Sequence, residues 1–324
     1  MAPIVLIISN RPNLTTQVFD RIRDERPKEL LIIADGPRED RPEDKDLTQQ
    51  CRKTVTSPDW PCSLETNFSE INLGCRSRIA SGLKWVFSLI PEAIVLEDDC
   101  LPSKGFFSFC SELLDHYRTD TRVMHISGDN FQGRWRGTGS YYFSRYAHTW
   151  GWATWRRAFK YYDENLSEWP QARKDHILEQ VFSNPKEVRY WRYILEQTHL
   201  GNIDTWDYQW LFALWMRSGL SILPNENLVT KIGAGPDALH SKDAHSTIGI
   251  PTAELGQIVH PDAVVTDKEA DSFTFVRHIF SPVPTAFQKI RARLAIRTRI
   301  KSLYSILLKN PGYRRQAAND DAPL

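Results

Sequence analysis

The sequence lacks the short motifs that most often mark a phosphate-binding loop. No GxGxxG follows the first apolar segment, and no GxxxxGKS or GxxxxGKT occurs in the 324 residues. Neither a dinucleotide-type loop nor a P-loop is therefore indicated. The formal net charge is only +1, which gives no signature of nucleic-acid binding, so we expect no nucleic-acid partner.

Long apolar runs and paired cysteines are also missing. No stretch is long enough to span a bilayer, and the apolar run at residues 4–8 lacks the basic flank and cleavage site of a signal peptide. The five cysteines are odd in number and include no CxxC pair. That spacing disfavours a disulfide framework and a zinc site. We therefore expect reduced thiols and a cytoplasmic protein.

What is present is an alternation of buried-type strands and amphipathic helices. Apolar segments at residues 3–9, 29–34, 93–96 and 123–128 are typical of strands covered on both faces. Helical spacing occupies residues 14–23, 76–90 and about 102–117 between them. We predict an α/β fold with a mostly parallel central sheet flanked by helices.

Acidic residues follow several of these strands. They are Asp35, the triplet Glu97-Asp98-Asp99, and Asp129. The carboxyl ends of parallel strands meet at one edge of a sheet, where open α/β sheets bind ligands. Mg²⁺ and Mn²⁺ prefer oxygen ligands and often share them with substrate phosphates. The pattern indicates a metal–diphosphate site; a solvated acidic turn is the alternative.

The second half of the chain carries further candidates, each with a plain structural alternative. Arg78 could bind an anion or belong to a solvated helix face. Trp150 and Trp152, in a segment (148–157) that we expect to turn into a helix, could form a sugar platform or ordinary core. Asp207 lies about one turn into a helix that Asp204 can cap, and it could simply complement the helix dipole. His240 lies in a glycine-rich loop at residues 233–241.

The C-terminal tail differs from the rest in charge. Residues 272–318 contain no Asp or Glu but ten Lys and Arg. Such a segment could lie on an anionic membrane surface, at the periphery of the inner membrane, or pack on the acidic remainder of the chain. We divide the chain into a domain at residues 1–270 and a basic, partly helical tail at residues 271–324.

Taken in order, these segments resemble a known family. Asn10-Arg11-Pro12 after the first strand, Asp35-Gly36 after the second, Asn72-Leu73-Gly74, and Val95-Leu96-Glu97-Asp98-Asp99 with Gly105-Phe106-Phe107 carry the resemblance. They are similar to GT-A glycosyltransferases of the N-acetylglucosaminyltransferase I type. They are still more similar to bacterial sugar-transferase-like proteins, some described as hemolysin-related. The resemblance covers about residues 3–240 and implies a GT-A, nucleotide-diphospho-sugar transferase fold.

The resemblance also implies roles. Asp99 would bind Mn²⁺ or Mg²⁺, with His240 touching the metal or the diphosphate. Arg11 and Asp35 would hold the uridine, and Glu97 and Asp98 would face the ribose and the waters of the metal. Asp207 would be the catalytic base. To these we add Arg78 as a donor-binding residue and three acceptor or sugar contacts, namely Asp129, Trp150 and Trp152.

The function implied is an inverting, metal-dependent transfer of a sugar from a UDP-sugar, with UDP-N-acetylglucosamine as the expected donor. The acceptor would be a glycan or glycolipid in bacterial polysaccharide assembly. Metal would stabilise the leaving diphosphate and one carboxylate would deprotonate the acceptor hydroxyl. Two rivals remain open: an inactive module that binds sugar nucleotides, and a metal-dependent phosphohydrolase.

Overall fold

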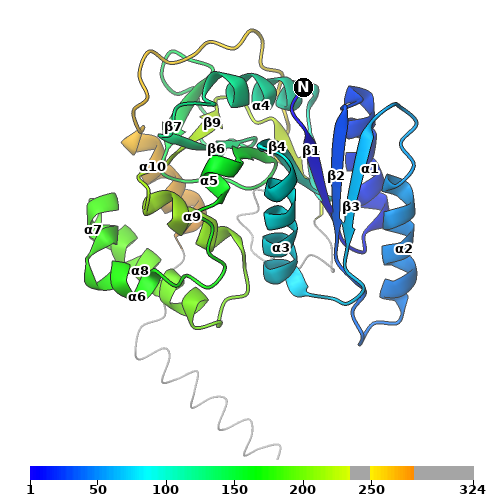
Figure 1. The fold of residues 1–324 in the computed structure, drawn as a ribbon. Helices are drawn as coiled ribbons and strands as arrows, with labels where there is room; N and C mark the ends of the chain where they lie inside the picture. The colour runs from blue at the N-terminus through cyan, green and yellow to red at the C-terminus, as the bar shows by residue number, and fades with distance from the viewer. Residues whose placement is uncertain (234–248, 281–324) are drawn as a thin grey trace, which may run out of the picture. The chain divides into compact units, whose positions relative to one another are not determined.

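The computed structural model describes residues 1–233 and 249–280, which belong to one compact unit, Met1–Phe280 (Figure 1). His240 and the basic tail after residue 280 lie outside the described residues. The unit runs past residue 270, where we predicted its end, because Asp271 is fully buried. Its carboxylate lies 2.9 Å from Nε of Arg145 and accepts a hydrogen bond from Ser144 Oγ at 2.5 Å.

An eight-stranded sheet forms the centre of this unit, in the order β3-β2-β1-β4-β8-β6-β9-β7. Within the described chain, β8 and β7 run antiparallel to their neighbours and the other strands run parallel. The strands are β1 (Ile4–Ile8), β2 (Glu29–Ala34), β3 (Ser63–Phe68), β4 (Glu92–Glu97), β6 (Val123–Ser127), β7 (Tyr141–Ser144), β8 (Trp152–Trp155) and β9 (Leu220–Pro224). The predicted mostly parallel α/β sheet is confirmed.

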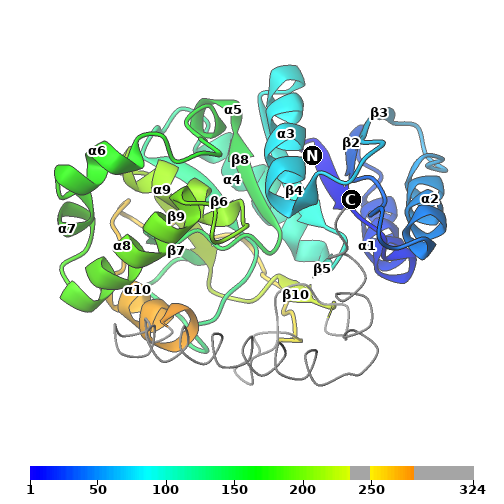
Figure 2. The same ribbon diagram turned by 90° about the horizontal axis from the view of Figure 1, so that it is seen from below.

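Helices cover both faces of the sheet because the strand residues alternate in direction. Ile32 faces a core shared with Phe19, whereas the neighbouring Ile33 meets Gly82 on the other side. The first face carries α1 (Pro12–Glu25), α2 (Glu43–Val55) and α4 (Lys104–His116), and the second carries α3 (Gly74–Leu89). Figure 2 shows α3 apart from α1 and α2.

The second half of the chain adds a helical lobe beside β6 and β9, drawn in green in Figure 1. Trp210 on its central helix donates a hydrogen bond from Nε1 to Nδ1 of the buried His125 at 3.1 Å, which ties the lobe to β6. Its helices are α5 (Arg156–Phe159), α6 (Trp169–Lys174), α7 (Ile177–Val181), α8 (Pro185–His199) and α9 (Asp207–Trp215). A further α-helix, α10 (Lys268–Thr274), leads into a π-helix, η1 (Phe275–Ile279).

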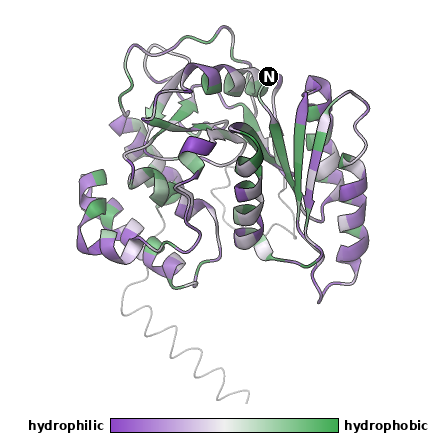
Figure 3. Cartoon of the chain, viewed as in Figure 1, coloured by the Kyte–Doolittle hydropathy of each residue, from purple (hydrophilic) through white to green (hydrophobic). Residues whose placement is uncertain are grey.

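A second sheet of two strands lies next to the acidic triplet. It pairs β5 (Cys100–Pro102) with β10 (Val229–Lys231) in antiparallel register, so that Lys231 lies opposite Cys100. The inner strands of the central sheet are mostly hydrophobic, whereas the edge strand β3 is largely polar and the outer helices mix both characters (Figure 3). No helix among the described residues is long and apolar enough to cross a membrane.

Candidate active site

The ends of β1 and β4 bring an arginine against the acidic triplet. Ile7 of β1 lies opposite Glu97 of β4 in the parallel ladder, so the segments that follow the two strands emerge side by side. Arg11 reaches across from the start of α1. Its Nη1 donates to Asp99 Oδ2 at 2.9 Å, and its Nη2 donates to Asp98 Oδ1. The predicted contact of Arg11 with uridine stays a prediction, beside this pairing with the triplet.

Asp98 is the most buried member of this cluster. It is 1% exposed, and its Oδ2 accepts hydrogen bonds from the Ser9 N–H at 3.2 Å and the Thr15 hydroxyl at 3.5 Å. Burial raises the pKa of Asp98, and the Arg11 guanidinium opposes that shift. With both oxygens engaged by the chain itself, Asp98 fixes Arg11 and the β1–α1 turn. Its predicted contact with the donor stays a prediction.

Asp99 meets a second cation that the sequence did not reveal. Nζ of Lys231 lies 3.6 Å from Asp99 Oδ2 and 5.1 Å from the centre of the Trp150 ring. The backbone supports this approach, because the Ile232 N–H donates to the Asp99 carbonyl at 2.8 Å. A Cβ on Gly233 would lie 2.9 Å from Cβ of Asp99, so glycine is needed there. The feature of the sequence that could have indicated this contact is the position of Lys231 just before the glycine-rich loop at residues 233–241.

Glu97 is the member of the triplet without a fixed partner. It makes no hydrogen bond or ion pair with any described residue, and burial followed by the Asp99 charge raises its pKa to about 7. A carboxyl in this state is partly protonated at neutral pH. It can receive either a hydroxyl group or a cation at the end of β4.

The raised pKa of Glu97 predicts a pH-dependent stability. In the native state the Glu97 carboxyl stays protonated up to about pH 7, whereas the ordinary pKa of a glutamate side chain is 4.5. Between those values the native state binds more protons than the unfolded state, so stability falls as pH rises through that window. Glu97→Gln should remove the slope and raise the free energy of unfolding at pH 8 by about 1–3 kcal/mol.

Urea unfolding from pH 4.5 to 8 measures the Glu97 effect. The matched control is Glu65→Gln, which changes an exposed glutamate on β3 and should leave the profile of the wild type intact. If Glu97→Gln and the wild type show parallel profiles, the raised pKa of Glu97 is wrong.

Asp35, at the end of β2, holds the start of α3. Its two oxygens accept hydrogen bonds from the N–H groups of Gly36 at 2.9 Å, Leu73 at 2.9 Å and Gly74 at 3.1 Å, and from Nδ2 of Asn72 at 3.1 Å. These donors occupy the carboxylate from within the chain. The contact of Asp35 with uridine stays a prediction. The structure adds a role that the sequence did not indicate, namely holding the backbone at the start of α3.

Removing the Asp35 carboxylate should therefore cost stability. Asp35→Ala leaves the N–H groups of Leu73 and Gly74 without their charged acceptor. We expect the free energy of unfolding, measured in urea, to fall by about 2–3 kcal/mol. Asp40→Ala is the control, because Asp40 is exposed in the loop after the same strand. A variant of Asp35 that keeps its stability but loses affinity for UDP would instead support the predicted uridine contact.

Arg78 has a comparable structural engagement. It is 4% exposed, and its guanidinium donates to the Ala34 carbonyl at 3.0 Å and to Asn67 at 2.5 Å (carbonyl) and 2.6 Å (Oδ1). It thereby joins the ends of β2 and β3 to α3. Neither alternative raised by the sequence, an anion ligand or a solvated face, describes these contacts; donor binding by Arg78 stays a prediction.

Asp207 is the first residue of α9, whereas the sequence predicted a helix capped by Asp204 with Asp207 about one turn in. Its Oδ1 accepts hydrogen bonds from the Thr205 hydroxyl and from the Tyr208 N–H at 3.0 Å, and its Oδ2 accepts none from a described residue. The preceding Trp206 is buried and stacks on Trp152 with ring centres 5.5 Å apart. A rigid aromatic support thus holds a carboxylate with one free oxygen.

The first turn of α3 connects Asp207 with the triplet. The pKa of the Cys75 thiol is raised to about 12, first by burial and then by the nearby carboxylates of Glu97, Asp207 and Asp204. The charges of Glu97 and Asp207 therefore both raise the pKa of this one thiol, although the two residues come from opposite halves of the sequence.

The three predicted acceptor contacts fall into different environments. Trp152 is 1% exposed and stacks on His125 at 5.2 Å, so it belongs to the core, and the platform interpretation is corrected for this residue. Trp150 is partly exposed below Lys231. Asp129 is 1% exposed; its Oδ2 lies 3.3 Å from Nδ1 of His148, but the groups are not aligned as a hydrogen bond.

The donor set tests the predicted metal site. Among residues 1–233 and 249–280, no group of three or more His, Cys, Asp or Glu side chains could hold a metal ion. Asp98 is engaged by Arg11, Ser9 and Thr15, and Asp99 already pairs with two cations. The residues that the structure describes do not fit a metal centre by themselves, and His240 lies outside them.

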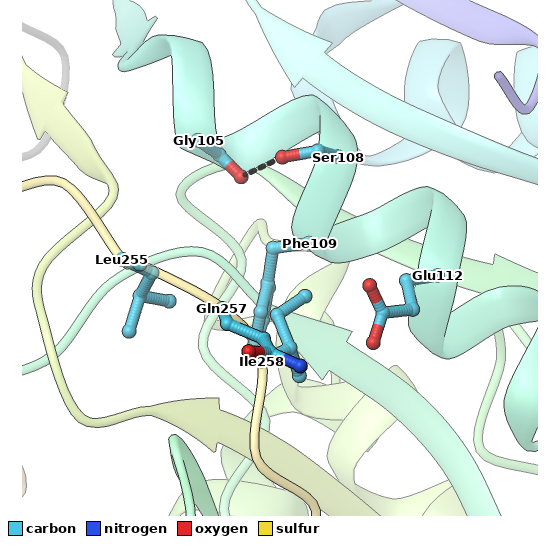
Figure 4. A pocket seen from close by; sticks show the side chains of 8 residues that line it. Gly105, Ser108, Phe109, Glu112, Leu255, Gln257 and Ile258 are labelled. Carbon is cyan, nitrogen blue, oxygen red and sulfur yellow. Dashed lines mark hydrogen bonds between the residues drawn. The ribbon is translucent and has the colours of Figure 1, made fainter.

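A cavity of about 250 Å³ lies elsewhere, between α4 and the segment at residues 255–258 (Figure 4). Ser108 donates a hydrogen bond to the Gly105 carbonyl at 3.0 Å on its wall, and Glu112 borders it. None of the predicted site residues lines this cavity. It therefore contributes nothing to the site built around the triplet.

Comparison with known proteins gives a limited result. No protein-family model matches the chain, and no curated protein matches its sequence. One similar solved structure is the 4-diphosphocytidyl-2C-methyl-D-erythritol synthase of Anaerococcus prevotii, at 9% identity and a TM-score of 0.35, covering 68% of this chain and 88% of that one. Another is TarS residues 1–349 of S. aureus, at 9% identity and a TM-score of 0.39, covering 71% of this chain and 60% of that one.

Proposed function

We propose that this chain is an inverting glycosyltransferase that moves a sugar, with N-acetylglucosamine as the first candidate, from a UDP-sugar to a glycan or glycolipid hydroxyl. The observation that carries the proposal is a cluster of carboxylates and cations at one strand edge, with the charge of Asp207 felt at Cys75 of α3 together with that of Glu97. The cluster lies at the ends of β1 and β4, and Asp207 is the first residue of α9.

The chemistry of transfer needs both groups. The acceptor oxygen attacks the anomeric carbon while the bond to the UDP oxygen breaks, and the electron pair of that bond leaves with UDP. Fixed positive charge near the diphosphate stabilises the charge that develops there. Asp207 takes the proton of the acceptor hydroxyl through its free Oδ2. A single base on the face opposite the leaving group corresponds to inversion, as in inverting hydrolysis.

Dependence on Mn²⁺ or Mg²⁺ stays a prediction. A divalent ion would supply Lewis-acid stabilisation of the leaving diphosphate. The resemblance assigns it to Asp99 and His240, but the described side chains do not complete a set of ligands for it. The roles given above to Asp207 and to the cations of the chain do not require it.

The test is incubation of the full chain with a panel of UDP-sugars and a library of glycan and glycolipid acceptors, with Mn²⁺ or with EDTA. The expected result is release of UDP with at least one donor. Binding of donor without turnover across the library would favour the inactive binding module. Release of inorganic phosphate from simple esters would favour the phosphohydrolase. No donor binding and no UDP release under either condition would end the proposal.

A further inference from the structure

We propose that Lys231, assisted by Arg11, is the diphosphate-binding cation of this site, and that Asp99 positions these two side chains instead of serving as a metal ligand. The inference rests on the proposed function and names the group that receives the phosphates. Its starting point is that the described residues around Asp99 do not by themselves supply the ligands of the predicted metal site.

Lys231 is placed so that it can bind an anion. Its side chain is 24% exposed, and its Nζ makes an ion pair with Asp99 at 3.6 Å but no hydrogen bond with a described residue. Toward the described residues, no N–H donor of the ammonium group is committed to a hydrogen bond, so the group can donate to phosphate oxygens. The Trp150 ring, 5.1 Å from Nζ, supports the charge from another side.

Arg11 strengthens the same patch of positive charge. Its side chain is 26% exposed, whereas that of Asp98, which it holds, is 2% exposed. Two of its donor nitrogens, Nη1 and Nη2, face Asp99 and Asp98, which fixes the plane of the guanidinium and leaves Nε without a described partner. Both cations thus anchor on buried carboxylates and present their remaining surface at the carboxyl ends of β1 and β4.

The ion pairs of the cluster agree with this assignment. Asp99 pairs with both Arg11 and Lys231, and Asp98 pairs with Arg11, so buried carboxylates fix both cations at the edge of the sheet. The pKa of Lys231 is raised because Asp99 and the acidic groups beside it together outweigh burial.

Equilibrium binding to the full chain in EDTA tests the inference, with UDP, UMP and uridine as probes. Wild type should bind UDP more tightly than uridine. Lys231→Gln should weaken UDP binding by about 10–100-fold and leave uridine binding within about twofold, because one charge-assisted contact to phosphate is lost. Lys231→Arg should keep most of the UDP affinity, and Lys104→Gln, which changes an exposed lysine at the start of α4, should match the wild type.

A second measurement needs no variant and so covers the case in which Lys231→Gln fails to fold. Lysines of the wild type are acetylated with acetic anhydride, with or without UDP, and mapped by mass spectrometry. UDP should protect Lys231 and not Lys104. Equal labelling of Lys231 in both samples would overturn the inference.

The outcomes separate this inference from the proposed function. If wild type binds UDP only with Mn²⁺, and folded Lys231→Gln then binds it equally well, an ion and not the lysine receives the phosphates, and the inference fails while the proposed function survives. If no nucleoside diphosphate binds the wild type with Mn²⁺ or with EDTA, the proposed function fails and the inference fails with it.

Discussion

Replacing Asp207 with Asn should lower turnover by about 10²–10⁴-fold while leaving the affinity for the UDP-sugar nearly unchanged. The amide keeps the size of the carboxyl and can still accept hydrogen bonds from Thr205 and Tyr208 through its oxygen. It cannot take a proton from the acceptor hydroxyl. Steady-state kinetics with the best donor, together with donor binding by calorimetry, measure the two quantities separately.

Asp204→Asn is the matched control for this prediction. Asp204 lies three residues earlier, and its charge also raises the pKa of the Cys75 thiol. It lies close to the start of α3, since a Cβ on Gly74 would be 3.8 Å from its Oδ2. We expect it to keep most of its turnover. If the two variants exchange behaviour, the base is Asp204. If Asp207→Asn loses donor binding as well, Asp207 is a donor-binding or structural residue.

The convergence of strand ends was predictable because it follows from local patterns. Apolar runs identified β1, β2, β4 and β6, and parallel pairing then places the residues after β1 and β4 together. The contact of Arg11 with the triplet follows from this pairing, although the sequence analysis assigned Arg11 to the uridine. The roles of Asp35 and Arg78 were harder to predict, because a carboxylate or guanidinium placed at a strand end can serve either a ligand or the backbone groups beside it.

Pairing between distant segments could not be read from the sequence. The segment at residues 148–157 was expected to turn into a helix, but its residues 152–155 form β8, which lies antiparallel between β4 and β6. Four residues rich in tryptophan carry too short a pattern to reveal a central strand. Lys231 is comparable, since only the pairing of β10 with β5 brings it to Asp99.

The stability of the site should depend most on Arg11. Arg11→Met removes the cation from Asp98, which is 1% exposed, and leaves a buried carboxylate with only the hydrogen bonds from Ser9 and Thr15. We expect a loss of about 3–5 kcal/mol in the free energy of unfolding at pH 8, measured in urea. Arg23→Met is the control, because Arg23 makes an exposed pair with Asp20, and it should cost under about 1 kcal/mol.

The pH dependence and a double variant identify the cause of that loss. Without Arg11 the pKa of Asp98 should rise further, because burial already raises it and the guanidinium is the main group that opposes the shift. The native state then holds a proton that the unfolded state releases, so the deficit should shrink as pH falls from 8 to 5. Arg11→Met with Asp98→Asn should recover most of the stability, since no buried charge remains. A deficit that is independent of pH and survives in the double variant would show that Arg11 stabilises the fold by packing instead of by charge.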